Sequence, residues 1–310
     1  MKHITILLAL LMFQLVPAQE RSPDLGATIY YLEQELPALM ESYKIPGGVV
    51  TIVMNDSLVY NQGFGYSHWD TKTPVDPNNT VFRVASLSKI VTTIAALQQV
   101  EHKAIDMEAD ITSYLDNVSV QNPYKTPVTL FHLLTHTGGF DQSNIARRSL
   151  VAQDRPPLEK YLSKRMPSVV FEPGSVIAYS NHGMALAGYL VEKTSGQSYS
   201  AYVEDQIFKP LDMSSSSFDK PEQFHDRLAK GYNKEYEETQ FEYLKTGPAS
   251  MLMTTGTNMS HFMRMLLNEG NWEGRQILSG ASVEKMLTTQ FRNHPAAEGR
   301  ALGFTTYDTQ

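Results

Sequence analysis

The chain has 310 residues, of which 42% are hydrophobic and 19% charged, so it can bury a full core in one or two domains. Its net charge of −7 comes without a clustered Lys/Arg run, which argues against a nucleic-acid surface, where basic patches supply the affinity. The sequence contains no cysteine, which excludes disulfides, a thiolate nucleophile and a lipid-modified cysteine at a signal peptide.

The N-terminus resembles an export signal. It reads MKHITILLALLMFQLVPAQE, with a basic residue, an apolar run from Ile4 to Val16, and Ala18 at the spacing that signal peptidase requires. The run is shorter than the roughly 20 apolar residues that a transmembrane helix needs. We therefore expect residues 1–18 to be a cleaved signal peptide and residues 19–310 to be one exported domain, periplasmic or secreted by a bacterium, without a stable membrane anchor.

The apolar spacing predicts a helix over residues 24–44, followed by a hairpin. The strands GGVVTIVM and SLVYNQGFGY are separated by Asn55-Asp56, a turn signal. An apolar helix is predicted from Ser86 to His102. The pattern indicates an α/β protein of the α+β type, in which helices flank an antiparallel sheet and a mostly helical subdomain is inserted. The later helices are expected at 129–136, 158–165, 181–195, 200–207, 257–268 and 281–289.

A serine and a lysine stand three residues apart in FRVASLSKIVT, at the start of the apolar helix. Positions i and i+3 share a helix face, so the Lys89 amine could take the proton of the Ser86 hydroxyl. The structural alternative is that Ser86 only caps the helix. Ser-x-x-Lys also occurs at Ser217 in a polar loop and at Ser282 near a helix N-cap, and we interpret both as chance matches.

A second motif, Tyr179-Ser180-Asn181, follows a Pro-Gly turn and precedes an apolar helix. Together with Ser86 and Lys89 it makes the chain resemble the serine β-lactamase and penicillin-binding-protein superfamily, within the branch of class C β-lactamases, DD-peptidases and related esterases. The segments that carry the resemblance over residues 45–290 are GFGYSHWDTKTPVDPNNTVFRVASLSK, VTLFHLLTHTGGF, FEPGSVIAYSNHG and IFKPLDMSSSSF.

The resemblance implies a role for each motif residue. Ser86 would be the acylated nucleophile and Lys89 would help to remove its proton. Tyr179 would pass a proton to the leaving group and activate the deacylating water, and Asn181 would bind the substrate's amide carbonyl. From the residues alone, Tyr179 could equally be a buried aromatic side chain and Asn181 a helix N-cap.

The family also has a Lys/His-Thr/Ser-Gly motif on a strand beside the nucleophile. Lys245-Thr246-Gly247 matches it literally, but Pro248 would remove a hydrogen bond from such a strand. We interpret it as a chance match, together with His136-Thr137-Gly138 and Lys193-Thr194-Ser195. The chain end, ALGFTTYDTQ, resembles the approach to the true motif, so we expect a C-terminally incomplete domain that lacks the later strands and is inactive and aggregation-prone by itself.

These observations predict a serine hydrolase that forms an acyl-enzyme at Ser86 and acts on a β-lactam, a D-alanyl peptide or a small ester. The alternative is a non-catalytic penicillin-binding or sensor protein with the same fold. We expect a small-molecule or peptide substrate, no cofactor, no nucleic acid and a monomer. His132 and His136 have the i, i+4 spacing of zinc ligands, but no catalytic glutamate lies between them and we predict no metal site.

Overall fold

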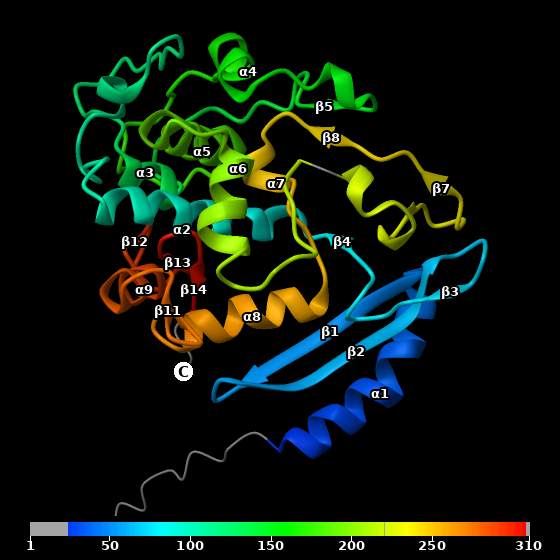
Figure 1. Cartoon of the computed structure of the whole chain (residues 1–310). Helices are drawn as coiled ribbons and strands as arrows, with labels where there is room; N and C mark the ends of the chain where they lie inside the picture. The colour runs from blue at the N-terminus through cyan, green and yellow to red at the C-terminus, as the bar shows by residue number, and fades with distance from the viewer. Residues whose placement is uncertain (1–23, 220, 308–310) are drawn as a thin grey trace, which may run out of the picture.

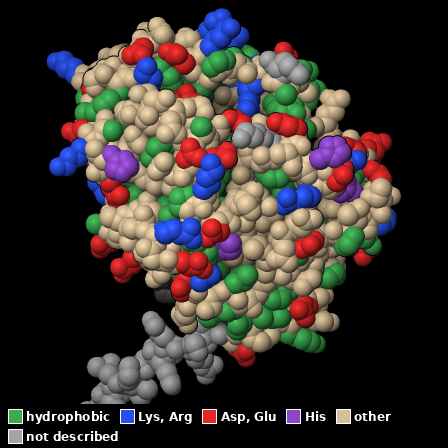
Figure 2. All heavy atoms as spheres, viewed as in Figure 1, with side chains coloured by type: hydrophobic (Ala, Val, Ile, Leu, Met, Phe, Trp, Pro, Cys, Tyr) green, Lys and Arg blue, Asp and Glu red, His purple; other side chains and the backbone are tan. Residues whose placement is uncertain are grey.

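The structure, a computed structural model, describes residues 24–219 and 221–307, so the predicted signal peptide at residues 1–18 lies outside the described residues. Figure 1 shows a body of helices above a two-stranded hairpin. Helix α8 (Gly256–Leu267) lies between them, and α1 (Leu25–Ser42) lies below the hairpin. No helix among the described residues is long and apolar enough to cross a membrane. Figure 2 shows basic and acidic side chains interspersed on the face viewed.

The hairpin forms where it was predicted. β1 (Gly47–Met54) pairs antiparallel with β2 (Ser57–His68), and β3 (Thr73–Pro74) adds a short third strand beside β2. Asn55 and Asp56 both have positive φ angles, 47° and 58°, as the tight turns that match strand twist require. Among the described residues β1 pairs only with β2. Helix α1 (Leu25–Ser42), whose N-cap is Asp24, precedes the hairpin.

Two largely buried helices form the centre of the helical body (Figure 1). The core of α2 (Ser88–Glu101) packs against α5 (Asn181–Ser195), and apolar side chains of both helices belong to one hydrophobic cluster. A 3₁₀ turn, η1 (Ala85–Leu87), leads into α2. Ser86 therefore lies one turn before the regular α-helix, which begins two residues later than predicted.

The remaining elements are short. The other helices are α3 (Leu130–Leu134), α4 (Leu158–Arg165), α6 (Tyr199–Val203) with a following π turn (Glu204–Phe208), α7 (Gly247–Ser250), α8 (Gly256–Leu267), α9 (Gly280–Leu287), and 3₁₀ turns at Ile111–Tyr114, Ala152–Asp154, Pro221–Gln223 and His225–Arg227. The paired strands are β4 (Phe82–Arg83) with β9 (Met253–Thr254), β5 (Arg148–Ser149) with β8 (Tyr243–Leu244), β6 (Gly231–Tyr232) with β7 (Glu238–Thr239), β10 (Asn271–Trp272) with β11 (Arg275–Gln276), and β12 (Phe291–Arg292), β13 (Gly299–Arg300) and β14 (Thr305–Thr306).

Two glycines allow close contacts that hold the layers together. A Cβ atom on Gly256 would lie 2.7 to 2.8 Å from Asn61, Thr51 and Val49, so this glycine lets α8 approach the hairpin. A Cβ atom on Gly188 would lie 2.4 Å from Cγ of Pro248, so α5 and α7 also meet closely. Helix α7 also contacts α2, the helix that follows Ser86.

The mixed helix-and-sheet architecture confirms the predicted fold class, and each helix expected from the apolar spacing is present within a few residues. Most of the predicted sheet is not formed among the described residues. The hairpin is its main part, and β12, β13 and β14 form a separate small sheet.

Candidate active site

Ser86 is exposed and lies in η1, the turn just before α2. Neighbouring residues hold this turn in place. Ala85 has φ of +45°, a conformation that costs about 1–2 kcal/mol for a residue with a side chain. The Ser88 hydroxyl donates to the Ala85 carbonyl at 2.5 Å and accepts from the Leu252 amide at 2.9 Å. Ser88 thus ties the turn that carries Ser86 to the segment just before β9.

Lys89 is 3% exposed and its amine has three acceptors. Its Nζ donates to Ser86 Oγ at 3.2 Å, to Asn181 Oδ1 at 2.9 Å and to the Ala249 carbonyl at 2.8 Å. Burial, with a further contribution from the positive charge of Arg147, lowers the pKa of Lys89 to about 7. The amine is therefore partly neutral at neutral pH and can accept a proton from Ser86.

Tyr179 contacts the same hydroxyl. Its Oη lies 2.9 Å from Ser86 Oγ, and its ring lies 4.8 Å from the Lys89 ammonium. The side-chain amide of Gln142 donates to the Tyr179 carbonyl at 3.1 Å. The phenol and the amine therefore both contact the Ser86 hydroxyl; spacing predicted the Lys89 contact, and the family resemblance implied that of Tyr179.

Asn181 is the first residue of α5, but it is not the helix cap. Ser180 is the N-cap, and its hydroxyl accepts from the Gly183 amide at 2.9 Å. The side-chain oxygen of Asn181 accepts from Lys89, which leaves the amide nitrogen of that side chain as a donor. The helix cap thus leaves Asn181 available to the site.

His136 holds the loop that carries Tyr179, a contact that the sequence analysis did not predict. Its Nδ1 accepts from the Ser180 amide at 3.3 Å, its carbonyl accepts from the Ala178 amide at 2.7 Å, and its ring packs 4.5 Å from the Tyr179 ring. Burial, reinforced by the charges of Lys89 and Arg300, lowers the pKa of His136 to about 3. The ring is neutral and serves as an acceptor.

The other Ser-x-x-Lys serines lie away from Lys89 and have structural roles. Ser217 lies outside the helices and named strands, as expected, but it is buried and pairs through its backbone with Met253. Ser282 lies in the first turn of α9, behind the true cap Ser279, and its hydroxyl donates to Glu101 at 2.6 Å.

Lys245-Thr246-Gly247 is not a strand beside Ser86. Thr246 is the N-cap of α7 and Gly247 is its first residue. The segment nevertheless leads into a helix that borders the site, because α7 supplies the Ala249 carbonyl that accepts from Lys89.

The histidine pair is occupied by backbone contacts. His132 Nδ1 accepts from the Thr129 amide at 3.2 Å as part of a capping box, while His136 contacts the Tyr179 loop. Across residues 24–219 and 221–307 no group of three His, Asp or Glu side chains is placed to hold a metal ion.

A family profile described as Beta-lactamase matches residues 32–310. Curated relatives include Protein flp of Staphylococcus aureus strain N315, 26% identical over 72% of this chain and 46% of that protein, and the Putative penicillin-binding protein PbpX of Bacillus subtilis strain 168, 27% identical over 78% and 58%. The chain therefore spans about half the length of these relatives.

Solved structures with the same fold include an octameric penicillin-binding protein homologue from Pyrococcus abyssi. It has a TM-score of 0.75 and 26% identity, and the match covers 90% of this chain and 65% of that one. The D-alanine carboxypeptidase AmpC from Burkholderia cenocepacia has a TM-score of 0.71 and 24% identity, with 90% and 74% of the two chains covered.

Proposed function

The chain belongs to the β-lactamase family, and from that premise we propose that it is a serine hydrolase that forms an acyl-enzyme at Ser86. Its substrate would be an amide or ester: a β-lactam, a D-alanyl peptide or a small ester. One observation carries the proposal: a buried amine with a pKa near 7, Lys89, lies 3.2 Å from the Ser86 hydroxyl while Tyr179 lies 2.9 Å from it.

In the acylation step, neutral Lys89 takes the Ser86 proton as Oγ attacks the substrate carbonyl, and the C–O bond forms as the carbonyl becomes a tetrahedral oxyanion. The acceptors Asn181 Oδ1 and the Ala249 carbonyl hold the amine in place and stabilise the ammonium that results. The Ser86 backbone amide is the proposed first donor to the oxyanion.

Collapse of the tetrahedral intermediate breaks the bond to the leaving group, which takes a proton from Tyr179. The ammonium of Lys89 then gives the proton that it took from Ser86 to the Tyr179 oxygen, because both groups lie beside the same Ser86 oxygen and therefore near each other. In deacylation the same groups remove a proton from the attacking water and return one to Ser86. The side-chain amide nitrogen of Asn181 would donate to the carbonyl of the substrate's side-chain amide.

The names of similar proteins suggest which substrates to test first. PbpX is named for penicillin binding and the AmpC neighbour for D-alanine carboxypeptidase activity. Penicillins and D-alanyl peptides share an amide carbonyl beside a carboxylate, and specificity between them depends on pocket shape. The N-terminal pattern supports an exported protein, periplasmic or secreted, as the setting for such substrates.

Covalent labelling tests the proposal. The protein is incubated with a fluorescent penicillin and, separately, with a fluorophosphonate, and the adduct is located by intact mass and peptide mapping. We expect one adduct at Ser86, none in Ser86→Ala, and unchanged labelling in Ser282→Ala, a matched serine of the same motif. Retained labelling in Ser86→Ala would overturn the assignment. An adduct that never turns over would favour the penicillin-binding or sensor alternative.

A further inference from the structure

A cavity of about 610 Å³ lies outside the Ser86 site, among the loop before α4, the end of α5, the start of α6 and the segment that leads into α7. None of the four candidate catalytic and substrate-binding residues lines it. The walls combine apolar side chains with charges of both signs: Pro156, Pro157, Leu158, Phe218 and Pro248 with Arg155, Lys193, Lys245, Glu159, Glu192 and Asp219.

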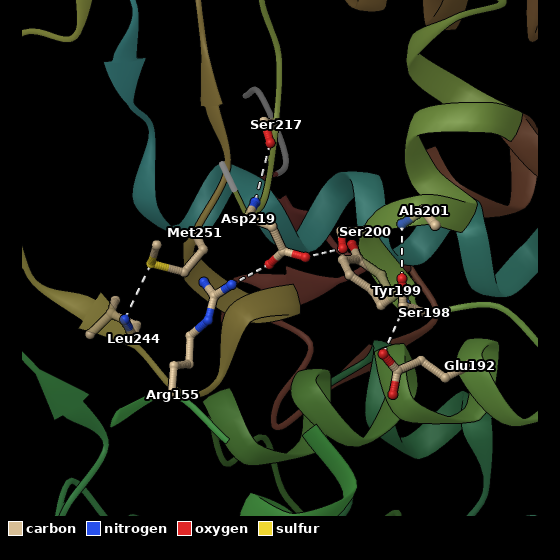
Figure 3. Close-up of polar contacts among 10 residues, drawn as sticks. All are labelled: Arg155, Glu192, Ser198, Tyr199, Ser200, Ala201, Ser217, Asp219, Leu244 and Met251. Carbon is tan, nitrogen blue, oxygen red and sulfur yellow. Dashed lines mark hydrogen bonds and ion pairs between the residues drawn. The ribbon is translucent and has the colours of Figure 1, made fainter. Parts of the chain in front are cut away.

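Some of these charges are neutralised within the wall. Figure 3 shows the Arg155 guanidinium and the Ser200 hydroxyl meeting at the two oxygens of the Asp219 carboxylate. Lys193 is paired with Asp116. This part of the cavity is a prebuilt polar surface with little net charge.

Three charges of the wall, Glu159, Glu192 and Lys245, have no partner of opposite charge among the described residues. Glu159 accepts from the Asn117 side-chain amide at 2.8 Å, which leaves Glu192 and Lys245 as the charges to consider. Glu192 is half-buried, and its Oε1 accepts from the Tyr199 amide at 2.8 Å (Figure 3). Burial raises the pKa of Glu192, and the carboxylates of Asp219 and Glu159 add to this effect. The Lys245 ammonium makes no ion pair or hydrogen bond with any described residue.

Both groups line the same cavity, yet they stand too far apart to form an ion pair with each other. A simple cation would be attracted to Glu192 and repelled by Lys245. A simple anion would be attracted to Lys245 and repelled by Glu192. A ligand that carries both charges satisfies both groups at once, and its body can pack against Pro157 and Phe218.

We propose that this cavity binds a small zwitterion, an amino acid or a short peptide, with its ammonium at Glu192 and its carboxylate at Lys245. The volume of about 610 Å³ is in the range typical of small-molecule sites and accommodates a dipeptide. This binding does not rest on the proposed hydrolase function.

The cavity shares a wall with the Ser86 site. Gly247 and Pro248 line it, and the Pro248 carbonyl accepts from Thr92 Oγ1 at 2.6 Å, one turn of α2 beyond Lys89. The next carbonyl, of Ala249, accepts from Lys89. A ligand held by Lys245 therefore alters the position of the Lys89 amine relative to Ser86, and this second part of the inference does rest on the proposed function.

The binding test uses glycylglycine as the probe and the full chain carrying Ser86→Ala, so that no turnover occurs. Calorimetry or ligand-observed NMR compares glycylglycine with N-acetylglycylglycine, which lacks the ammonium, and glycylglycine amide, which lacks the carboxylate. We expect each blocked peptide to bind about tenfold more weakly or worse, as for loss of one charge-assisted hydrogen bond. Equal binding of all three, or no binding at millimolar concentration, would overturn the site.

Two variants locate the bound peptide. Glu192→Gln keeps the acceptor for the Tyr199 amide and removes the charge, and Lys245→Met keeps the length of the side chain. Each should weaken glycylglycine binding about tenfold, while Lys164→Met, on α4 outside the cavity, should not change it. If Glu192→Gln fails to fold, Lys245→Met decides the result, and unchanged affinity in a folded Lys245→Met protein places the peptide elsewhere.

The coupling test measures the labelling rate at intact Ser86 with and without saturating glycylglycine. We expect the rate to change at least twofold and the change to disappear in Lys245→Met. An unchanged rate with binding intact would refute the coupling. Failure to label Ser86 at all would count against the hydrolase proposal and would leave the binding result on Ser86→Ala unaffected.

Discussion

At the scale of single residues, the proposed chemistry depends on the protonation state of Lys89. Its pKa is lowered to about 7, chiefly by burial. Below this pH the amine is protonated and cannot accept the Ser86 proton, so the rate of labelling should rise as the pH increases through about 7 and level off above it.

A pH series of fluorophosphonate labelling measures this midpoint. Lys89→Ala should reduce the rate by several orders of magnitude, because members of a catalytic unit fail together, and the residual rate should lose the midpoint near 7. A loss below about tenfold, or a midpoint that survives the substitution, would show that Lys89 is structural.

His136 is expected to act as a positioning residue through Tyr179. His136→Ala removes the acceptor for the Ser180 amide and the ring beneath Tyr179, and a displacement of about 1 Å can cost on the order of 10²-fold in rate. The labelling rate should fall by about one to two orders of magnitude without a shift of the Lys89 midpoint.

Conservative variants separate positioning from loss of stability. His136→Asn places an acceptor near the position of Nδ1 and should recover part of the rate. His132→Asn alters the neighbouring histidine, which contacts Thr129 rather than Tyr179, and should label normally. A His136→Asn protein no faster than His136→Ala would refute the proposed hydrogen-bonding role.

At the scale of elements, the contact between α5 and α7 links the core to the site. Gly188→Ala would place a Cβ atom 2.4 Å from Cγ of Pro248, and such overpacking typically costs about 1–3 kcal/mol. Because Ala249 follows Pro248 directly, the displacement also moves an acceptor of Lys89. We expect a lower free energy of unfolding and slower labelling of Ser86.

Urea unfolding and labelling kinetics check this prediction. Gly48→Ala on β1 is the control, because its added Cβ atom would have no heavy atom within 4 Å. Full stability and a normal labelling rate in Gly188→Ala would mean that the two helices adjust without affecting Lys89.

At the scale of the whole molecule, buried neutral histidines make stability depend on pH. Burial, together with the charge of Arg147, lowers the pKa of His182 to about 4, and its Nε2 lies 3.0 Å from the Tyr161 hydroxyl. Between pH 6.5 and about pH 4 the unfolded chain binds a proton at His182 more readily than the folded chain does. The contribution of neutral His182 to stability is therefore complete above pH 6.5 and is lost as the pH falls toward 4.

Urea denaturation between pH 7.5 and pH 4.5 should therefore show a decreasing free energy of unfolding. His182→Gln should flatten this dependence at the cost of lower stability at neutral pH. An identical slope in His182→Gln would exclude it as a source of the acid sensitivity.

The sequence by itself identified the hairpin, the helices and the contact between Ser86 and Lys89. Periodicity predicts helices because a buried stripe follows the 3.6-residue repeat, and Asn55-Asp56 predicts the turn because few residues adopt positive φ readily. Local spacing also predicted the contact between Ser86 and Lys89, since positions three residues apart lie on one helix face. Tyr179 and Asn181 were assigned to this site only through the family resemblance.

Tertiary packing decided what local patterns could not express. The burial that lowers the pKa of Lys89, and its acceptor on Ala249, depend on α5 and α7, which lie about 90 and 160 residues further along the chain. The contact of His136 with the Tyr179 loop is likewise a long-range contact, so the sequence showed only a histidine in a family-like loop. Desolvation and hydrogen-bond partners are properties of neighbours in space, and only the folded chain defines those neighbours.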